Sequence, residues 1–91
     1  MTDLRREAID RSCTLRLDGC NVTPCCLAHW RQSGISGMGW KAPDPIGAWL
    51  CHNCHQRVDT TDRGNAEVQL LFARAVFRTQ AQLIAEGKLK W

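Results

Sequence analysis

The clearest pattern of hydrophobic and polar positions lies in the last third of the chain. Apolar residues recur there at the three- and four-residue spacing of one face of an α-helix: Val68, Leu71, Phe72, Ala75 and Val76. Asp62 or Asn65 can cap the start of this helix, and Gly87 can end it. The pattern therefore predicts a helix over about residues 65–86.

Three more apolar residues of this segment, Leu70, Phe77 and Ile84, lie off that face. An exposed apolar stripe usually marks an interface. We therefore expect a homodimer built partly on helix 65–86, with Arg74 and Arg78 at its polar edge, where they can face phosphate. The alternative is a monomer in which the N-terminal helix covers the second stripe.

Shorter elements are expected before this helix. Thr2 can cap a short helix over residues 2–12. Within residues 13–24, the alternating run Thr-Leu-Arg-Leu predicts a strand that enters a tight turn at Asp18-Gly19. The start of the chain therefore adds one helix and one strand to the expected fold.

The middle of the chain holds two apolar runs separated by a segment rich in Gly and Pro. Residues 25–30 and 47–51 predict two strands, and residues 31–47 predict a long, ordered loop between them. A short helix is expected to begin near His52. Together these patterns predict a small α+β domain with a short N-terminal helix and a longer C-terminal helix.

Composition agrees with one globular domain over residues 1–91, since 44% of the residues are hydrophobic and 23% are charged. No uncharged apolar stretch is long enough to span a membrane. The first residues carry mixed charges instead of the apolar centre of a signal peptide. We therefore expect a cytoplasmic protein without a membrane partner.

Six cysteines in so small a chain are unusual, and in a reducing compartment clustered cysteines favour a metal site. Cys51 and Cys54 have the spacing of half a tetrahedral zinc site, and Cys13 and Cys20 are the natural other half. The competing pair, Cys25-Cys26, is adjacent on a strand and points to opposite faces. We predict one structural zinc ion; otherwise Cys13 and Cys20 are small buried apolar residues.

The sequence Cys51-His52-Asn53-Cys54-His55 has two other interpretations. It matches the pattern of covalent haem attachment, but no export signal accompanies it. It also contains the spacing of a disulfide oxidoreductase, but not the long βαβ context of one. Neither is favoured.

Two histidines are candidates for chemistry outside the zinc site. If Cys54 faces the zinc ion, His55 faces elsewhere and can bind a second, catalytic metal ion. His29 ends the predicted strand 25–30, and the expected hairpin allows the two histidines to meet across one cleft. The alternative is that His29 is a satisfied structural residue.

Four sequence blocks now add a resemblance. They are Cys-Thr-Leu-Arg-Leu-Asp-Gly-Cys-Asn, Leu-Ala-His-Trp-Arg, Gly-Ile-Ser-Gly-Met-Gly-Trp-Lys-Ala-Pro-Asp, and Ala-Trp-Leu-Cys-His-Asn-Cys-His-Gln-Arg-Val-Asp. In order and spacing, over about residues 3–62, they resemble the YbcO-like family of phage and prophage proteins. That resemblance implies a nuclease with an HNH, or ββα-metal, core over about residues 13–62, acting in a bacterial host cell.

The resemblance also implies roles for particular residues. His29 falls on the general base that activates water, and His55 falls on the ligand of a catalytic divalent cation such as Mg²⁺. Asp44 is the best-placed residue for orienting the base, where such enzymes have an asparagine. Ala28 stands where many of them have another metal ligand, so that water, phosphate, Asp44 or Asp59 would have to complete the coordination.

The expected function is metal-dependent endonuclease cleavage of DNA. The net charge of +3 permits an anionic partner, and nine of the twelve cations are arginine, which pairs well with phosphate. Candidates for holding phosphate are Arg31, Lys41, Arg57 and Arg63. The alternatives are a zinc-binding adaptor or DNA-binding protein without catalysis, and a structural interaction protein that uses helix 65–86.

Overall fold

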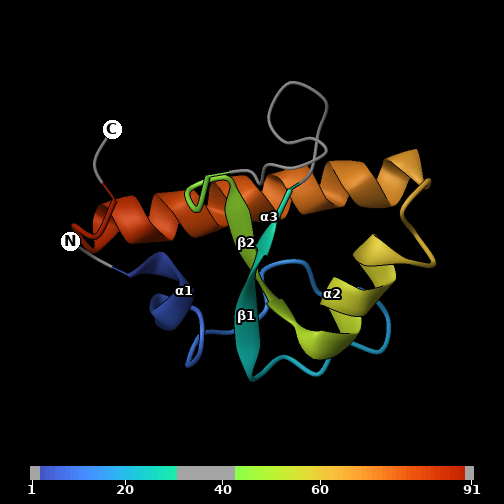
Figure 1. Ribbon diagram of the computed structural model, residues 1–91, viewed down its shortest axis with the longest axis horizontal. Helices are drawn as coiled ribbons and strands as arrows, with labels where there is room; N and C mark the ends of the chain where they lie inside the picture. Colours follow the sequence, from blue (N-terminus) through green and yellow to red (C-terminus); the bar gives the residue numbers. More distant parts are fainter. Residues whose placement is uncertain (1–2, 31–42, 90–91) are drawn as a thin grey trace.

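A computed structural model describes residues 3–30 and 43–89. Along the chain they form α1 (Leu4–Glu7), β1 (Cys25–His29), β2 (Gly47–Cys51), α2 (His52–Asp59) and α3 (Ala66–Ala85) (Figure 1). The α+β class and the order of these five elements agree with the sequence pattern. Within the described residues, no helix is long and apolar enough to cross a membrane.

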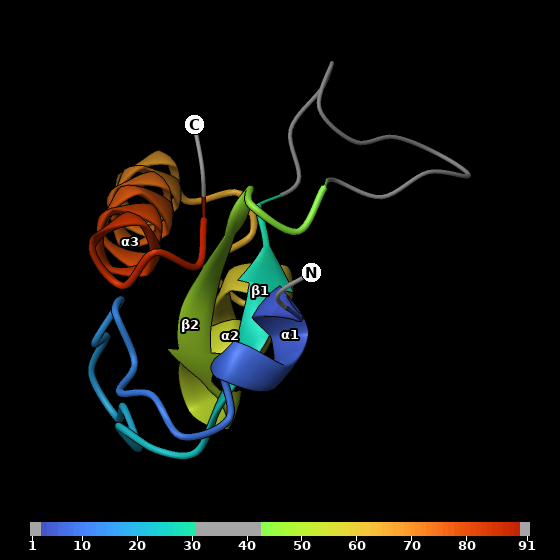
Figure 2. The same cartoon turned by 90° about the vertical axis from the view of Figure 1, so that its left-hand side faces the viewer.

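The two strands form an antiparallel hairpin that confirms the predicted strands. Cys25 pairs with Cys51 at one end of the hairpin, and His29 pairs with Gly47 at the other. α2 begins directly after β2, so it starts at the cysteine end. All five residues of β2 are buried. α3 runs along β2 on the side away from β1, as the two views show (Figures 1 and 2).

α3 confirms the predicted C-terminal helix, and its packing against β2 depends on one polar residue. Thr79 is fully buried, and its hydroxyl accepts a hydrogen bond from the backbone N–H of Trp49 at 3.2 Å. It also lies 3.3 Å from the hydroxyl of Thr14. Leu83, one turn later, is also fully buried. The helix is therefore fixed in register against β2 by a hydrogen bond as well as by apolar contact.

The helix ends follow from local capping. The Asn65 side chain accepts from the backbone N–H groups of Glu67 and Val68, which decides between the two caps proposed for α3. Gly87 follows its end with φ +73, a conformation that favours glycine. At the other end of the chain, Asp3 caps α1. Thr2, the expected cap, lies outside the described residues.

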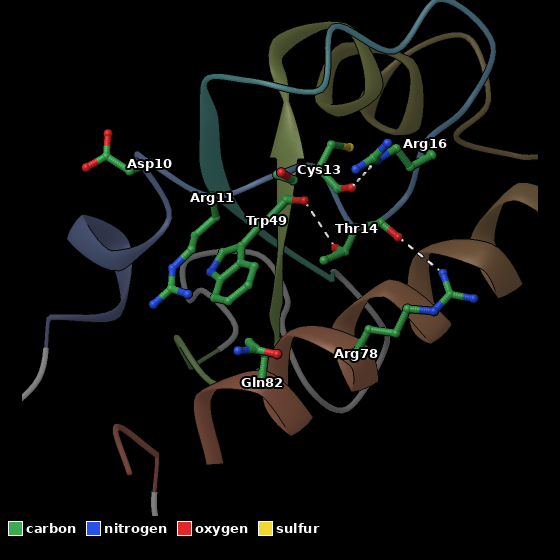
Figure 3. A pocket seen from close by; sticks show the side chains of 9 residues that line it. Asp10, Arg11, Cys13, Thr14, Arg16, Trp49, Arg78 and Gln82 are labelled. Atoms are coloured by element: carbon green, nitrogen blue, oxygen red, sulfur yellow. Dashed lines mark hydrogen bonds between the residues drawn. The ribbon is translucent and has the colours of Figure 1, made fainter. Parts of the chain in front are cut away.

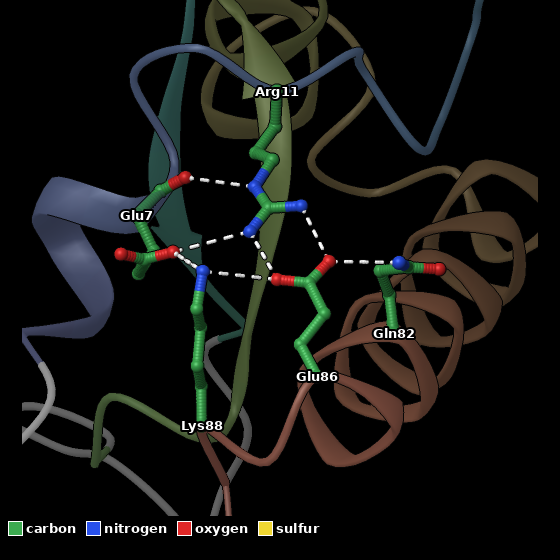
Figure 4. A network of polar contacts seen from close by, with 5 residues as sticks. All are labelled: Glu7, Arg11, Gln82, Glu86 and Lys88. Atoms are coloured by element: carbon green, nitrogen blue, oxygen red, sulfur yellow. Dashed lines mark hydrogen bonds and ion pairs between the residues drawn. The ribbon is translucent and has the colours of Figure 1, made fainter.

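α1 is much shorter than the predicted helix over 2–12, because tertiary contacts redirect the chain after Glu7. The Arg11 guanidinium lies 4.7 Å from the centre of the Trp49 ring. It also joins Glu7 to Glu86, with Lys88 and Gln82 completing the network (Figure 4). Hydrogen bonds from Lys88 and Arg11 hold the pKa of Glu7 below the ordinary range, and hydrogen bonds from Arg11, Gln82 and Lys88 do the same for Glu86. The network joins the N-terminal segment to the end of α3.

The strand predicted within residues 13–24 is wrong: this described segment has no strand. It makes single backbone hydrogen bonds instead, from Cys13 N–H to Val22 and from Thr14 N–H to Trp49, both at 2.8 Å. Arg16 and Val22 have φ values of 58 and 66, which are incompatible with a strand. The predicted turn at Asp18-Gly19 is present, with Gly19 at φ +83.

Candidate functional site

The four cysteines predicted to bind zinc come together at the end of the hairpin where α2 begins. Cys13 and Cys20 come from the irregular segment before β1, Cys51 ends β2, and Cys54 lies in the first turn of α2. Their ligand atoms all lie within 4.8 Å of one another. The sulfurs of Cys20 and Cys51 are 3.6 Å apart. A tetrahedral zinc ion with Zn–S bonds of about 2.3 Å places its sulfurs about 3.8 Å apart, so the residues fit this metal.

Within the cluster, the surroundings of Cys51 suit a negatively charged sulfur, whereas burial raises the pKa values of Cys20 and Cys54. Cys13, Cys51 and Cys54 are at most 2% exposed. Burial raises the pKa of Cys51, but backbone N–H groups of Cys54 and Asn21 donate to its Sγ and bring that pKa down to about 6. Cys20 Sγ accepts from the Val22 N–H at 3.3 Å. Since zinc binds thiolates, these N–H groups favour the metal-binding form.

Neither of the two remaining cysteines belongs to the cluster. The Cys25 thiol is buried, donates to the carbonyl of Val22 at 3.3 Å, and has a pKa raised by burial to about 12. Cys26 is exposed and meets His55, with 3.1 Å between Sγ and Nδ1. Alternation along β1 therefore separates the pair, as expected from the sequence.

At the other end of the hairpin, His29 forms a hydrogen bond with Asp44. His29 Nε2 and Asp44 Oδ1 are 2.8 Å apart, and Arg5 Nε donates to the same oxygen at 3.3 Å. The hydrogen bond to His29, together with Arg5, lowers the pKa of Asp44. A neutral His29 that donates from Nε2 to this carboxylate presents Nδ1 as a proton acceptor. The structure thus brings together the two residues suggested for general-base chemistry.

His55 lies on α2 in a separate group of side chains. Its Nε2 is 3.2 Å from Oδ2 of Asp59, one helical turn later. Neighbouring ligands of an octahedral ion, each about 2.1 Å from the metal, are about 3 Å apart, so this nitrogen–oxygen pair fits two positions around a divalent cation. Among residues 3–30 and 43–89, the four cysteines are the one group of three or more side chains arranged for a metal ion. Water or substrate would therefore supply the other ligands at His55.

The expectation that the two histidines meet across one cleft is not met by direct contact. His55 packs against Cys26, whereas His29 points to the opposite face of β1 because the two positions are three residues apart. No hydrogen bond between described residues joins the two groups. The physical reason is the antiparallel register, which starts α2 beside Cys25, four residues from His29.

The predicted phosphate-binding residues have different surroundings. The Arg57 guanidinium is engaged within the fold: Nε and Nη2 pair with Asp62 at 2.8 Å, and Nη1 donates to the Asp18 carbonyl at 3.0 Å. It therefore connects α2 to the turn at Asp18-Gly19. Arg63 is exposed. Arg31 and Lys41 lie outside the described residues.

Sequence reasoning missed the contact between Cys26 and His55. The available signal was the pair Cys25-Cys26 on a strand whose next element carries His55, since one of two adjacent strand residues must face that helix. Asp59, already one of the candidates for completing the coordination of the catalytic cation, lies four residues after His55 on the same helix face and does meet it.

Comparison with known proteins adds independent findings. Residues 2–88 match the family model described as "Putative nuclease YbcO". Curated relatives named Putative nuclease YbcO, from Escherichia coli (strain K12) and from Enterobacteria phage 82, are each 39% identical over 97 residues, covering 99% of both chains. A solved structure titled "Structure of a putative bacteriophage protein from Escherichia coli str. K-12 substr. MG1655" is similar with a TM-score of 0.71 and 29% identity, covering 93% of this chain and 100% of that one.

Proposed function

Since this chain belongs to the YbcO family, whose members are named as nucleases, we propose that it is an endonuclease that hydrolyses DNA phosphodiesters with the help of a divalent cation. In this proposal β1, β2 and α2 form an HNH-like ββα core. The observation that carries the proposal is the His29–Asp44 hydrogen bond of 2.8 Å at the partly exposed end of β1.

His29 is proposed as the general base. Asp44 accepts a hydrogen bond from the N–H at Nε2 and so orients the ring. Nδ1 is then left to take a proton from water. As that proton arrives, the Asp44 carboxylate stabilises the imidazolium. Arg5, bound to the same carboxylate oxygen, holds Asp44 in place. The histidine would thus generate the nucleophile that attacks phosphorus.

His55 and Asp59 are proposed to hold the catalytic divalent cation, for which Mg²⁺ is one candidate. When bound, such a cation neutralises charge on the phosphate and on the leaving oxygen. The contact between Cys26 and His55 fixes the ring on the side away from Asp59, so that Nε2 is directed toward the carboxylate. Arg63, together with Arg31 and Lys41, is proposed to contact phosphates of the DNA backbone.

The four-cysteine cluster is proposed to hold a structural zinc ion. A site with four protein ligands leaves no position for water or substrate, which is typical of structural zinc. Its ligands come from three separate parts of the chain, so the ion would join the segment before β1 to β2 and α2. This role is distinct from hydrolysis.

Nicking of supercoiled plasmid DNA tests the nuclease proposal. The wild-type protein should nick the plasmid when Mg²⁺ or Mn²⁺ is added, and His29→Ala should slow nicking by about 10²–10⁴-fold, the usual size of a general acid–base contribution. His52→Ala is the matched control, because His52 is exposed at the start of α2 and outside both histidine groups. Equal rates for wild type and His29→Ala would contradict the assignment.

The same assay also tests the alternative of a non-catalytic adaptor. Binding of the plasmid without nicking under any added divalent cation would support that alternative and overturn the nuclease. The names of the curated relatives do not favour it.

We also propose that α3 forms a homodimer. Leu70 and Phe77 are 56% and 67% exposed and lie seven residues apart with Ile84 following, so they form one stripe along the helix. A second copy can cover such a stripe with its own α3. Phe77→Glu should therefore convert a dimer to a monomer in sedimentation, whereas Ile9→Glu, at an apolar residue 53% exposed outside α3, should not. A wild-type monomer at micromolar concentration would contradict the dimer.

A further inference from the structure

A pocket beside α3 is lined by arginines that have no role in the proposed nuclease site. It has a volume of about 460 Å³, and three arginines line it: Arg11, Arg16 and Arg78 (Figure 3). Arg11 and Arg16 come from the segment after α1, and Arg78 comes from α3. Thr14 and Trp49 also line the pocket. An acidic residue, Asp10, also lines the pocket, and Figure 3 shows it far from Arg16 and Arg78.

Two of these arginines keep their positive charge available. Arg11 is neutralised by Glu7 and Glu86. Arg16 and Arg78 instead donate to backbone carbonyls, from Arg16 Nε to Cys13 at 2.8 Å and from Arg78 Nη1 to Thr14 at 3.2 Å. Within the part of the chain that the structure describes, neither forms a salt bridge. Each guanidinium has five N–H donors, so most remain free to bind an anion.

The hydrogen bonds also position the two guanidinium groups. Their acceptors are consecutive carbonyls, so both arginines are directed to the same short stretch of chain. Arg16 occupies a left-handed backbone conformation, which is unusual for a residue other than glycine or asparagine. The turn of the chain at Arg16 therefore helps to fix the direction of its cationic side chain.

We propose that Arg16 and Arg78 bind phosphates of the backbone of the DNA substrate. This inference rests on the proposed function and adds a second contact, separate from the hydrolytic residues. Arginine forks match phosphate oxygens, so an open pocket lined by free arginines suits a phosphate contact. Trp49 pairs with Leu27, two residues before His29, so the pocket and His29 lie on one face of the hairpin. One DNA strand can therefore meet both.

The test measures the affinity of a labelled DNA duplex over a range of salt concentrations, using His29→Ala protein so that the DNA stays intact. Adding Arg78→Gln should weaken binding to duplexes of unrelated sequence by a similar factor. It should also reduce the magnitude of the slope of log affinity against log salt by about one, as expected for one lost phosphate contact. Arg16→Gln should act in the same direction. Arg6→Gln is the control: Arg6 is exposed on α1, does not line the pocket and has no proposed phosphate contact.

Equal losses for Arg78→Gln and Arg6→Gln would overturn the pocket as a specific contact. A duplex affinity unchanged by Arg78→Gln, together with binding of inorganic phosphate that the same variant abolishes, would assign the pocket to a small anion and also overturn the DNA contact. Melting curves check that each variant is folded, and Arg78→Lys should restore part of the affinity because it keeps the charge.

Hydrolysis of bis(p-nitrophenyl) phosphate separates this inference from the proposed function. This small diester does not reach the pocket and the hydrolytic residues together, so Arg78→Gln alone should hydrolyse it at the wild-type rate. A wild-type protein that hydrolyses neither the diester nor DNA would overturn the nuclease, while the salt dependence of DNA binding would still decide the pocket.

Discussion

The two ends of the β hairpin are built from different chemistry. At the end where Cys25 pairs with Cys51, four sulfurs lie within 4.8 Å of one another, and three of their cysteines are buried. At the end where His29 pairs with Gly47, a single imidazole meets a single carboxylate, with side chains 17% and 35% exposed. The first end is closed and its ligands converge; the second remains accessible to water.

Under the proposed function, this difference assigns stabilisation of the fold to the cysteine end and hydrolysis to the histidine end. A closed tetrahedral set satisfies a zinc ion completely, so its binding free energy contributes to folding. An accessible histidine with one oriented nitrogen can exchange a proton with a bound water molecule. Changes at the two ends should therefore have separable effects on stability and on activity.

The largest effect is expected at the cysteine end. Cys54→Ser removes a fully buried ligand, and chelation of zinc should have a similar effect, because structural zinc contributes about 10–16 kcal/mol of apparent binding free energy. We expect the cooperative melting transition, monitored by circular dichroism, to be lost. Cys26→Ser, at an exposed cysteine outside the cluster, should melt like the wild type. A metal-free protein with the wild-type melting curve would contradict the zinc site.

A smaller effect is expected from the partner of His29. Asp44→Asn keeps the size of the side chain but removes the charge that orients and stabilises the imidazole, so nicking should slow by about 10–100-fold, as for other partners that orient a histidine. Melting should change little near neutral pH, since the carboxylate is 35% exposed. Nicking at the wild-type rate would show that Asp44 does not assist His29.

The pKa of Asp44 also predicts where this pair responds to acid. Because the folded pKa is below the ordinary value of 3.8, the stabilisation is present above that value. It is lost as the pH falls through the lower folded pKa. Asp44→Asn should therefore be slightly less stable than the wild type, by a constant amount, at all pH values above about 3.8, and the two melting curves should converge as the pH falls through the folded pKa.

Sequence patterns predicted the elements whose residues act locally. α3 follows from helical spacing and the Asn65 cap, and the hairpin follows from two apolar runs. The four cysteines could be grouped because the spacing of Cys51 and Cys54 already defines half a zinc site. These features need little knowledge of the rest of the fold.

The errors occur where distant contacts override local pattern. The alternation at Thr14–Leu17 resembles a strand, but Cys13 and Cys20 both reach the cluster, and the chain between them turns through the left-handed Arg16. Arg57 resembles a free surface cation, yet Asp62 and the carbonyl of Asp18 occupy its guanidinium. Asp62 is only five residues away, but the Asp18 carbonyl could not be identified before the turn at Asp18-Gly19 was placed beside α2.

We propose that stability and hydrolysis are carried by opposite ends of the hairpin. The most direct test of this separation is to measure bound zinc and the rate of plasmid nicking on the same preparation of His29→Ala. We predict about one zinc ion per chain, as in the wild type, with nicking reduced by about 10²–10⁴-fold. Loss of zinc together with activity, or full activity in the zinc-loaded variant, would contradict the claim.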